Sequence, residues 1–228
     1  WARVLNWAQG KVADVPDRLP YELAKRVWGA GPQLNADHDV QPVQLVMATK
    51  PGTQTVRPFV RPHVRDMLLY QSLVDALQPH IESSLPPSST AFSYRLAPID
   101  NHEIFATSPQ WLDFRQAVRS GLQAELSSYC VRGDLASFFL TVDTEKLGRR
   151  LLEIGADGRV VEDLAGLLRG WHLQGVRGLP QGVPASGPLA NVYLRNIDSL
   201  LSQTAERYWR YSDDFVALTG NFSDARAL

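Results

Sequence analysis

Hydrophobic residues in much of this chain recur three and four positions apart, which predicts helices. Residues 65–78 carry such an apolar stripe. Ser108-Pro109 is typical of a helix start, because serine caps the first turn and proline fits the first helical position. We expect further helices after Asp143-Thr144 and from Ser186 onward. Short helices are also expected in residues 1–36.

Other segments have the composition of β-strands. Two β-rich runs around Lys50-Pro51-Gly52-Thr53 predict a hairpin over residues 43–59. Residues 131–142 are expected to form one strand. A second strand–turn–strand unit is predicted around Asp213, between Arg207–Arg210 and Phe215–Leu218. This order of elements predicts an α+β fold, in which helices cover one face of an antiparallel sheet.

Composition narrows the class of protein. The chain has 228 residues, 44% of them hydrophobic, which is enough for a sizeable core in one or two closely packed lobes. A net charge of −1 argues against a surface that is basic all round, but not against a local basic groove. Such a groove is possible in residues 40–65, which contain no acid and include Lys50 and Arg57. Cys130 is the only cysteine, so an internal disulfide and a cysteine-based zinc site are excluded.

The sequence shows neither a signal peptide nor an apolar run long enough to span a membrane. We therefore expect a cytoplasmic protein with no membrane partner. The chain begins at Trp1 and ends at Leu228, in what resembles the first turn of a helix. It is therefore expected to be a fragment or a processed piece.

Three aspartates are the strongest chemical signal. Asp213 and Asp214 are adjacent at a predicted strand turn, where their like charges repel unless a cation lies between them. Asp134 ends a predicted strand upstream, and two neighbouring strands could bring it close to Asp213. Two divalent ions about 4 Å apart, held by such carboxylates, stabilise both the attacking and the leaving oxygen of nucleotidyl transfer. Asp214 is expected to be a supporting ligand, since successive strand residues point to opposite faces.

Between these acids lies a glycine-rich loop, residues 178–182. It is either a plain loop before a helix or a backbone that a flat base pair can approach closely. The small residues after it, among them Ser186 and Gly187, leave room for a nucleic-acid strand or for tight packing.

Together these segments resemble motifs A, B and C of reverse transcriptases. The likeness rests on residues 134–139, on residues 178–194 and on Tyr211-Ser212-Asp213-Asp214. Residues 50–57 resemble the fingers hairpin of that family, and residues 65–95 resemble the next fingers segment of its bacterial members. The likeness covers roughly residues 40–220.

The resemblance implies a role for each matching residue. The catalytic carboxylates, which would also bind Mg²⁺ or Mn²⁺, are Asp134, Asp213 and Asp214. Residues that match the nucleotide-binding positions are Lys50, Arg57, Phe139 and Gln181. Residues expected near the primer and template are Tyr211, Gly182 and Ser186. The Phe139 ring would clash with a 2′-hydroxyl, whereas RNA-dependent RNA polymerases have an aspartate here, so deoxynucleotides should be favoured.

The implied architecture is the fingers and palm of a right-hand polymerase, with an antiparallel palm sheet backed by helices. Residues 1–36 would form an N-terminal helical segment, residues 37–130 the fingers, and residues 131–228 the palm. The likeness stops before motif D and the thumb, so a C-terminal thumb or a fused domain is an expected partner. Lys50 also falls just before the hairpin proline rather than after it.

The resulting hypothesis is an RNA-directed DNA polymerase that acts on an RNA template, a DNA or RNA primer and deoxynucleoside triphosphates. It would belong to a retron, a group II intron, a CRISPR-linked system or a phage-defence system. Three alternatives remain open: template-independent DNA synthesis by the same site, a catalytically silent palm-like scaffold that binds nucleic acid, and a maturase role in RNA splicing.

Overall fold

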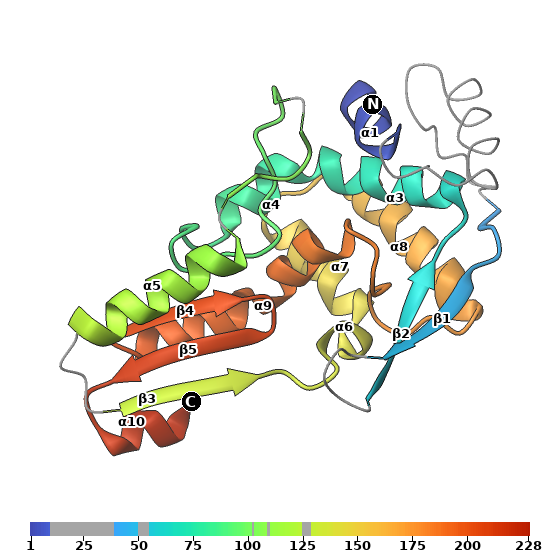
Figure 1. Cartoon of the computed structure of the whole chain (residues 1–228). Coiled ribbons are helices and arrows are strands. Elements are labelled where there is room, and N and C mark those ends of the chain that lie inside the picture. The colour runs from blue at the N-terminus through green and yellow to red at the C-terminus, as the bar shows by residue number, and fades with distance from the viewer. Residues whose placement is uncertain (10–38, 50–54, 102, 109, 125–128) are drawn as a thin grey trace.

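The described residues form a mixed α+β fold with two separate antiparallel sheets (Figure 1). The computed structural model describes residues 1–9, 39–49, 55–101, 103–108, 110–124 and 129–228. The smaller sheet is a hairpin of β1 (Gln44–Thr49) and β2 (Val56–Arg61), which confirms the hairpin predicted over residues 43–59. Within the described part of the chain, no helix is both long and apolar enough to cross a membrane.

The larger sheet has three strands in the order β3–β5–β4. Its strands are β3 (Tyr129–Asp134), β4 (Arg207–Tyr211) and β5 (Asp214–Thr219). Strands β4 and β5 form a hairpin whose two-residue tip is Ser212-Asp213, as the sequence predicted. Strand β3 pairs with the other edge of β5, although a long stretch of chain separates the two strands.

Helices pack on both faces of this sheet. Helix α5 (Trp111–Ala124) covers one face, where its Phe114 packs against Trp209 and Val216. Helices α9 (Ser186–Thr204) and α10 (Phe222–Ala227) lie on the other side of the sheet. Leu201 of α9 packs there against Phe215 and Ala217. The expectation of helices on one face was therefore wrong, because successive residues of β5 point to opposite faces and both sets are apolar.

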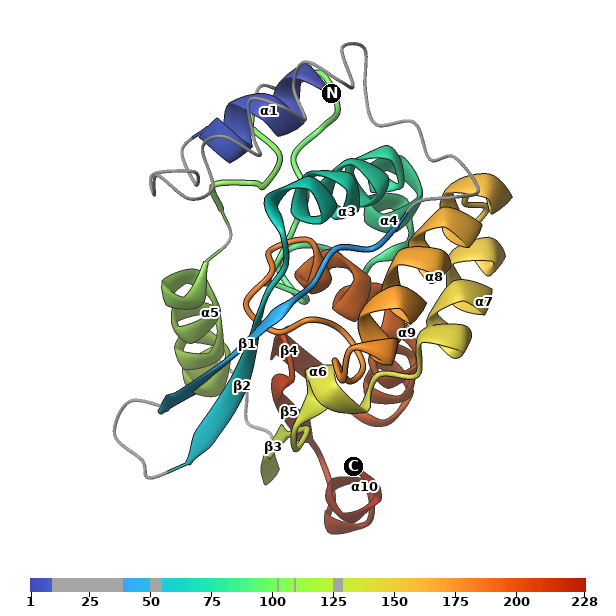
Figure 2. The ribbon, with the colours of Figure 1, turned by 90° about the vertical axis from the view of Figure 1, so that its right-hand side faces the viewer.

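The main hydrophobic core lies among the helices beside the hairpin (Figure 2). It joins α3 (Val64–Ala76), α7 (Thr144–Glu153), α8 (Gly158–Leu173) and the first half of α9, with α1 (Ala2–Gln9) and α4 (Gln78–Ser84) at its edge. At its centre the ring of Tyr70 meets that of Trp171 edge to face, with centroids 5.1 Å apart. Of the short helices expected in residues 1–36, α1 is present, and residues 10–36 lie outside the described residues.

The strand predicted over residues 131–142 is shorter than expected. It ends at Asp134, and a single helical turn, α6 (Phe138–Thr141), follows. Ser137 turns the chain with a left-handed φ of 53°. The Phe139 carbonyl then accepts a hydrogen bond from the Leu179 amide at 2.8 Å, so tertiary contact rather than local sequence decides this segment.

Only some of the helices begin where the sequence predicted. Asp143 caps α7 as predicted, with its carboxylate accepting bonds from the next backbone amides. Helix α5 begins at Trp111, later than Ser108-Pro109 suggested, and the Asp113 carboxylate accepts from the Gln110 amide at 2.6 Å. Ser186 is the first residue of α9 rather than its cap. Its hydroxyl donates a hydrogen bond to the Pro180 carbonyl instead of capping the helix.

Candidate active site

The three aspartates meet where β3 and β5 run side by side. Asp134 and Asp214 are direct partners in the strand register, so their side chains lie on the same face of the sheet. Cα atoms of such partners are about 4.5–5.5 Å apart. The Leu135 amide also donates to the Asp213 carbonyl at 3.3 Å, which ties the end of β3 to the turn. Asp214 was expected to be only a supporting metal ligand, but it is the residue paired with Asp134 in the sheet. Asp213 lies at the tip of the β4–β5 hairpin.

The chemistry of these acids suits a divalent metal ion only if further ligands complete the site. No three His, Cys, Asp or Glu side chains in the ranges described above converge closely enough to hold an ion by themselves. Mg²⁺, however, keeps several waters and is usually bound by one or two carboxylates together with substrate phosphates. Asp134 is exposed and Asp214 is partly exposed, with Arg132 Nη2 3.9 Å from its carboxylate. The residues therefore fit a Mg²⁺ site that a triphosphate would complete.

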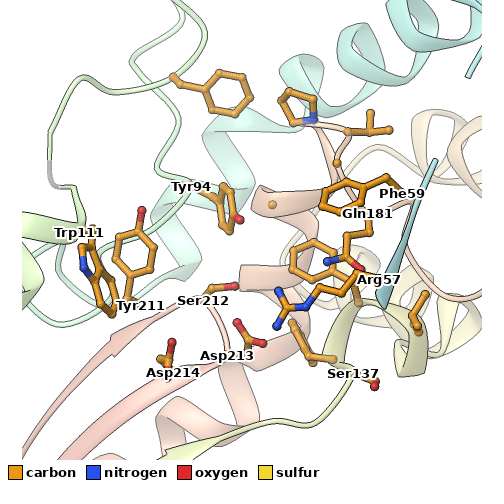
Figure 3. A pocket seen from close by; sticks show the side chains of 18 of the residues that line it. Arg57, Phe59, Tyr94, Trp111, Ser137, Gln181, Tyr211, Ser212, Asp213 and Asp214 are labelled. Atoms are coloured by element: carbon orange, nitrogen blue, oxygen red, sulfur yellow. The ribbon is translucent and has the colours of Figure 1, made fainter. Parts of the chain in front are cut away.

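A cavity of about 830 Å³ lies between the turn and the β1–β2 hairpin. Figure 3 shows Arg57 extending from the hairpin toward Asp213. The predicted site residues that line the cavity are Arg57, Phe139, Gln181, Gly182, Tyr211, Asp213 and Asp214. Asp134 does not line it but adjoins it through Asp214. Lys50 lies outside the described residues.

The glycine-rich loop is fastened to the hairpin. The Gln181 carbonyl accepts a hydrogen bond from the Val60 amide at 2.9 Å. Gly182 has a φ of +89°, and a Cβ there would lie 2.5 Å from the Phe59 ring. Glycine is therefore required both by the backbone conformation and by the close approach of Phe59. Phe59 thus covers the side of Gly182 on which a Cβ would lie, while Gly182 also lines the cavity.

Ser186 does not reach the cavity. It is fully buried, and its hydroxyl donates to the Pro180 carbonyl at 2.8 Å and lies 3.1 Å from the Tyr70 hydroxyl. The structure thus places Ser186 behind the loop, where it fixes the backbone just before Gln181.

The small residue Gly187 serves tight packing. A Cβ at Gly187 would lie 2.3 Å from the ring of Tyr94, which therefore rests directly on the start of α9. Tyr94 has a positive φ of 53° and lines the cavity (Figure 3). Burial, and then the neighbouring Tyr211 and Asp213, raise the pKa of its hydroxyl. Sequence reasoning missed Tyr94, because no local motif marks it.

Two aromatic side chains, Trp111 and Tyr211, line the cavity beside Asp214, and Phe114 packs behind them. The rings of Trp111 and Tyr211 meet edge to face with centroids 5.1 Å apart, and Phe114 lies 5.9 Å from Tyr211. Burial raises the pKa of Tyr211, which stays protonated and offers a hydroxyl to the cavity near neutral pH. Trp111 was also missed from the sequence, because no local motif marks it as a cavity residue.

Comparison with known proteins shows the family of the chain. A search among curated proteins gave no significant match. The family model described as reverse transcriptase (RNA-dependent DNA polymerase) matches residues 48–227, a range that includes β2, the glycine-rich loop and all three aspartates. The chain therefore belongs to the reverse transcriptase family.

Proposed function

We propose that Asp134, Asp213 and Asp214 form the Mg²⁺-binding catalytic centre of an RNA-directed DNA polymerase. Reverse transcriptase activity in general follows from the family, and the assignment of these residues goes further. The observation that carries it is the register that pairs Asp134 with Asp214 beside a cavity lined by Asp213. Mn²⁺ prefers the same oxygen ligands and could replace Mg²⁺.

The reaction joins the primer 3′-oxygen to the α-phosphorus of a deoxynucleoside triphosphate. The bond from that phosphorus to pyrophosphate breaks, and the hydroxyl loses its proton. Two bound divalent ions would stabilise the charge on the attacking and leaving oxygens. The three carboxylates would hold these ions, and Arg57 would make charge-assisted bonds to the triphosphate, which suits its position opposite Asp213. Lys50 is proposed to add a second positive charge.

The remaining site residues orient the substrates. Phe139 lines the cavity and would exclude a 2′-hydroxyl, which supports deoxynucleotides as the substrate. Gln181 borders the same space and is proposed to contact the incoming nucleotide. Tyr211, beside the aspartates, is proposed to lie near the primer end. Gly182 and Ser186 would act through the loop that they hold in place.

We further propose that residues 37–130 act as fingers and residues 131–228 as the palm, with residues 1–36 as a helical extension. The cavity between the β1–β2 hairpin and the three-stranded sheet supports this division. The likeness of residues 65–95 to bacterial family members supports a role in a bacterial mobile element or an antiviral defence system.

Primer extension on an RNA template with Mg²⁺ tests the proposal, with wild-type protein compared with Asp213→Ala. We expect the wild type to extend the primer and the variant to lose activity by a factor of about 10³ or more, as for other losses of a central catalytic group. Asp157→Asn is the control, because Asp157 is an exposed acid that caps α8 and asparagine caps equally well.

Equal activity of wild type and Asp213→Ala would reject the catalytic assignment. A reaction without template separates two kinds of synthesis, since products of one repeated base would indicate untemplated addition. A wild type that binds nucleic acid but never extends a primer would indicate a silent scaffold.

A further inference from the structure

A buried ion pair lies beneath the turn that carries Asp213. Arg210 of β4 is 1% exposed, and its guanidinium binds both carboxylate oxygens of Asp198 on α9, at 2.8 Å each. The same guanidinium donates to the Ser212 carbonyl at 3.1 Å and to Asn191 Oδ1 at 2.9 Å. One rigid fork of donors thus joins α9 to the backbone of the turn.

A second contact holds the turn from its other side. The Ser212 amide donates to Ser93 Oγ at 2.7 Å, and the Ser93 carbonyl accepts from Asn191 Nδ2 at 2.7 Å. Both backbone polar groups of Ser212 are therefore bound by side chains from other elements. Asn191 joins these two contacts into one network, because its side chain accepts a hydrogen bond from Arg210 and donates one to the Ser93 carbonyl.

This arrangement is needed because the turn is strained. Ser212 has a φ of +57°, a conformation that costs a non-glycine residue free energy and persists only where surrounding contacts enforce it. A two-residue hairpin loop usually meets the requirement for positive φ with Gly or Asn. Here a serine meets it, and the buried network supplies the enforcing contacts.

Stability alone does not explain a buried ion pair at this place. The free energy needed to remove two charges from water offsets much of the attraction between them. Apolar residues of similar volume often stabilise a core at least equally. Directional contacts, by contrast, fix a backbone position that apolar packing leaves loose. The residue that follows Ser212 is Asp213, whose position the proposed chemistry requires.

We propose that Asp198 and Arg210 are positioning residues, which fix the Ser212-Asp213 turn and thereby set the place of the Asp213 carboxylate. The inference rests on the proposed function of Asp213. Neither Asp198 nor Arg210 lines the cavity, so their effect on synthesis passes through the turn.

Asp198→Asn tests the inference in the primer-extension assay. It removes the charge and one acceptor of the fork while keeping the volume of the side chain. We expect kcat to fall about 100-fold, as misplacement of a reacting group by about 1 Å does. The KM for the deoxynucleotide should change by less than about threefold, since substrate contacts are kept. A readout independent of activity is amide hydrogen exchange, which should become faster at Ser212 and Asp213.

Asp75→Asn is the matched control. It breaks another buried Arg–Asp pair, Arg3–Asp75 at 2.9 Å between α1 and α3, away from the turn. It should lower the melting temperature while leaving kcat and the exchange of the turn unchanged. Ser93→Ala is the milder second variant, because it deletes only the acceptor of the Ser212 amide, and we expect kcat to fall about tenfold.

The outcomes separate the two proposals. If the wild type extends primers while Asp198→Asn and Ser93→Ala keep its kcat and its slow exchange, the positioning inference is rejected alone. An equal loss of kcat in Asp75→Asn also rejects it, because the effect would then follow general stability. A wild type without any synthesis rejects the proposed function, and the inference with it.

Discussion

At the scale of single residues, Phe139 carries the proposed choice of substrate. Its ring lines the cavity and meets the ring of Tyr94 edge to face, with centroids 6.4 Å apart. The Phe138 ring also meets it edge to face, with centroids 5.7 Å apart, so two aromatic neighbours hold the Phe139 ring. A phenyl ring forms no hydrogen bond with a hydroxyl group, so in the proposed site Phe139 would act as a steric wall.

Phe139→Ala should relax the preference for deoxynucleotides. Removing the ring opens space for a 2′-hydroxyl, so the ratio of kcat/KM for deoxynucleotides to that for ribonucleotides should fall by a factor of about 10 or more. The ratio is measured in single-nucleotide primer extension. Phe105→Ala is the control, because Phe105 lines the same cavity on the side of residues 94–106. An unchanged ratio in Phe139→Ala would show that another group makes the choice.

The candidate acids could be selected from the sequence because they lie in local motifs. Asp213 and Asp214 are adjacent in sequence, and the pattern around Asp134 is distinctive, so the sequence alone led to three candidate acids, two of which the strand register pairs. Tyr94 and Trp111 were not predictable as cavity residues, because their places depend on contacts with Gly187 and Tyr211, both far along the chain. The partner of Asp134 was also not predictable, since strand register depends on the whole sheet.

At the scale of elements, the contact between the glycine-rich loop and β2 determines the shape of the cavity. The Val60–Gln181 backbone bond and the packing of Phe59 on Gly182 join two segments that lie far apart in sequence. Sequence spacing predicted both segments but not their contact. The strand predicted over residues 131–142 was too long for the same reason. The hydrogen bond from the Leu179 amide to the Phe139 carbonyl supports the helical turn there, and this long-range contact cannot be predicted from sequence spacing.

Gly182→Ala should destabilise the protein. The added methyl group meets the Phe59 ring, and alanine is strained at a φ of +89°, so the free energy of unfolding should fall by about 1–3 kcal/mol. Urea unfolding measures this change. In a Phe59→Ala background the steric part should vanish and the backbone part remain, which a double-mutant cycle separates. If Gly182→Ala has wild-type stability, the described contact between loop and hairpin is wrong.

At the scale of the whole molecule, the main hydrophobic core and the candidate active site lie in different parts of the fold. The main core lies among the helices beside the hairpin, and two smaller apolar clusters cover the two faces of the three-stranded sheet. The aspartates lie at the end of that sheet, where β3 leaves it and β4 turns into β5. The α+β class and the order of elements were predictable from periodicity, whereas helices on both faces of the sheet became evident only in three dimensions.

The central claim is that Asp134 and the aspartates of the turn share one metal centre. Anomalous diffraction from crystals of the protein grown with Mn²⁺ and a deoxynucleoside triphosphate tests it most directly. We predict a Mn²⁺ peak within about 2.5 Å of carboxylate oxygens from both Asp134 and Asp213 or Asp214, beside the triphosphate. Mn²⁺ bound by the triphosphate alone, with Asp134 outside its coordination sphere, would contradict the account.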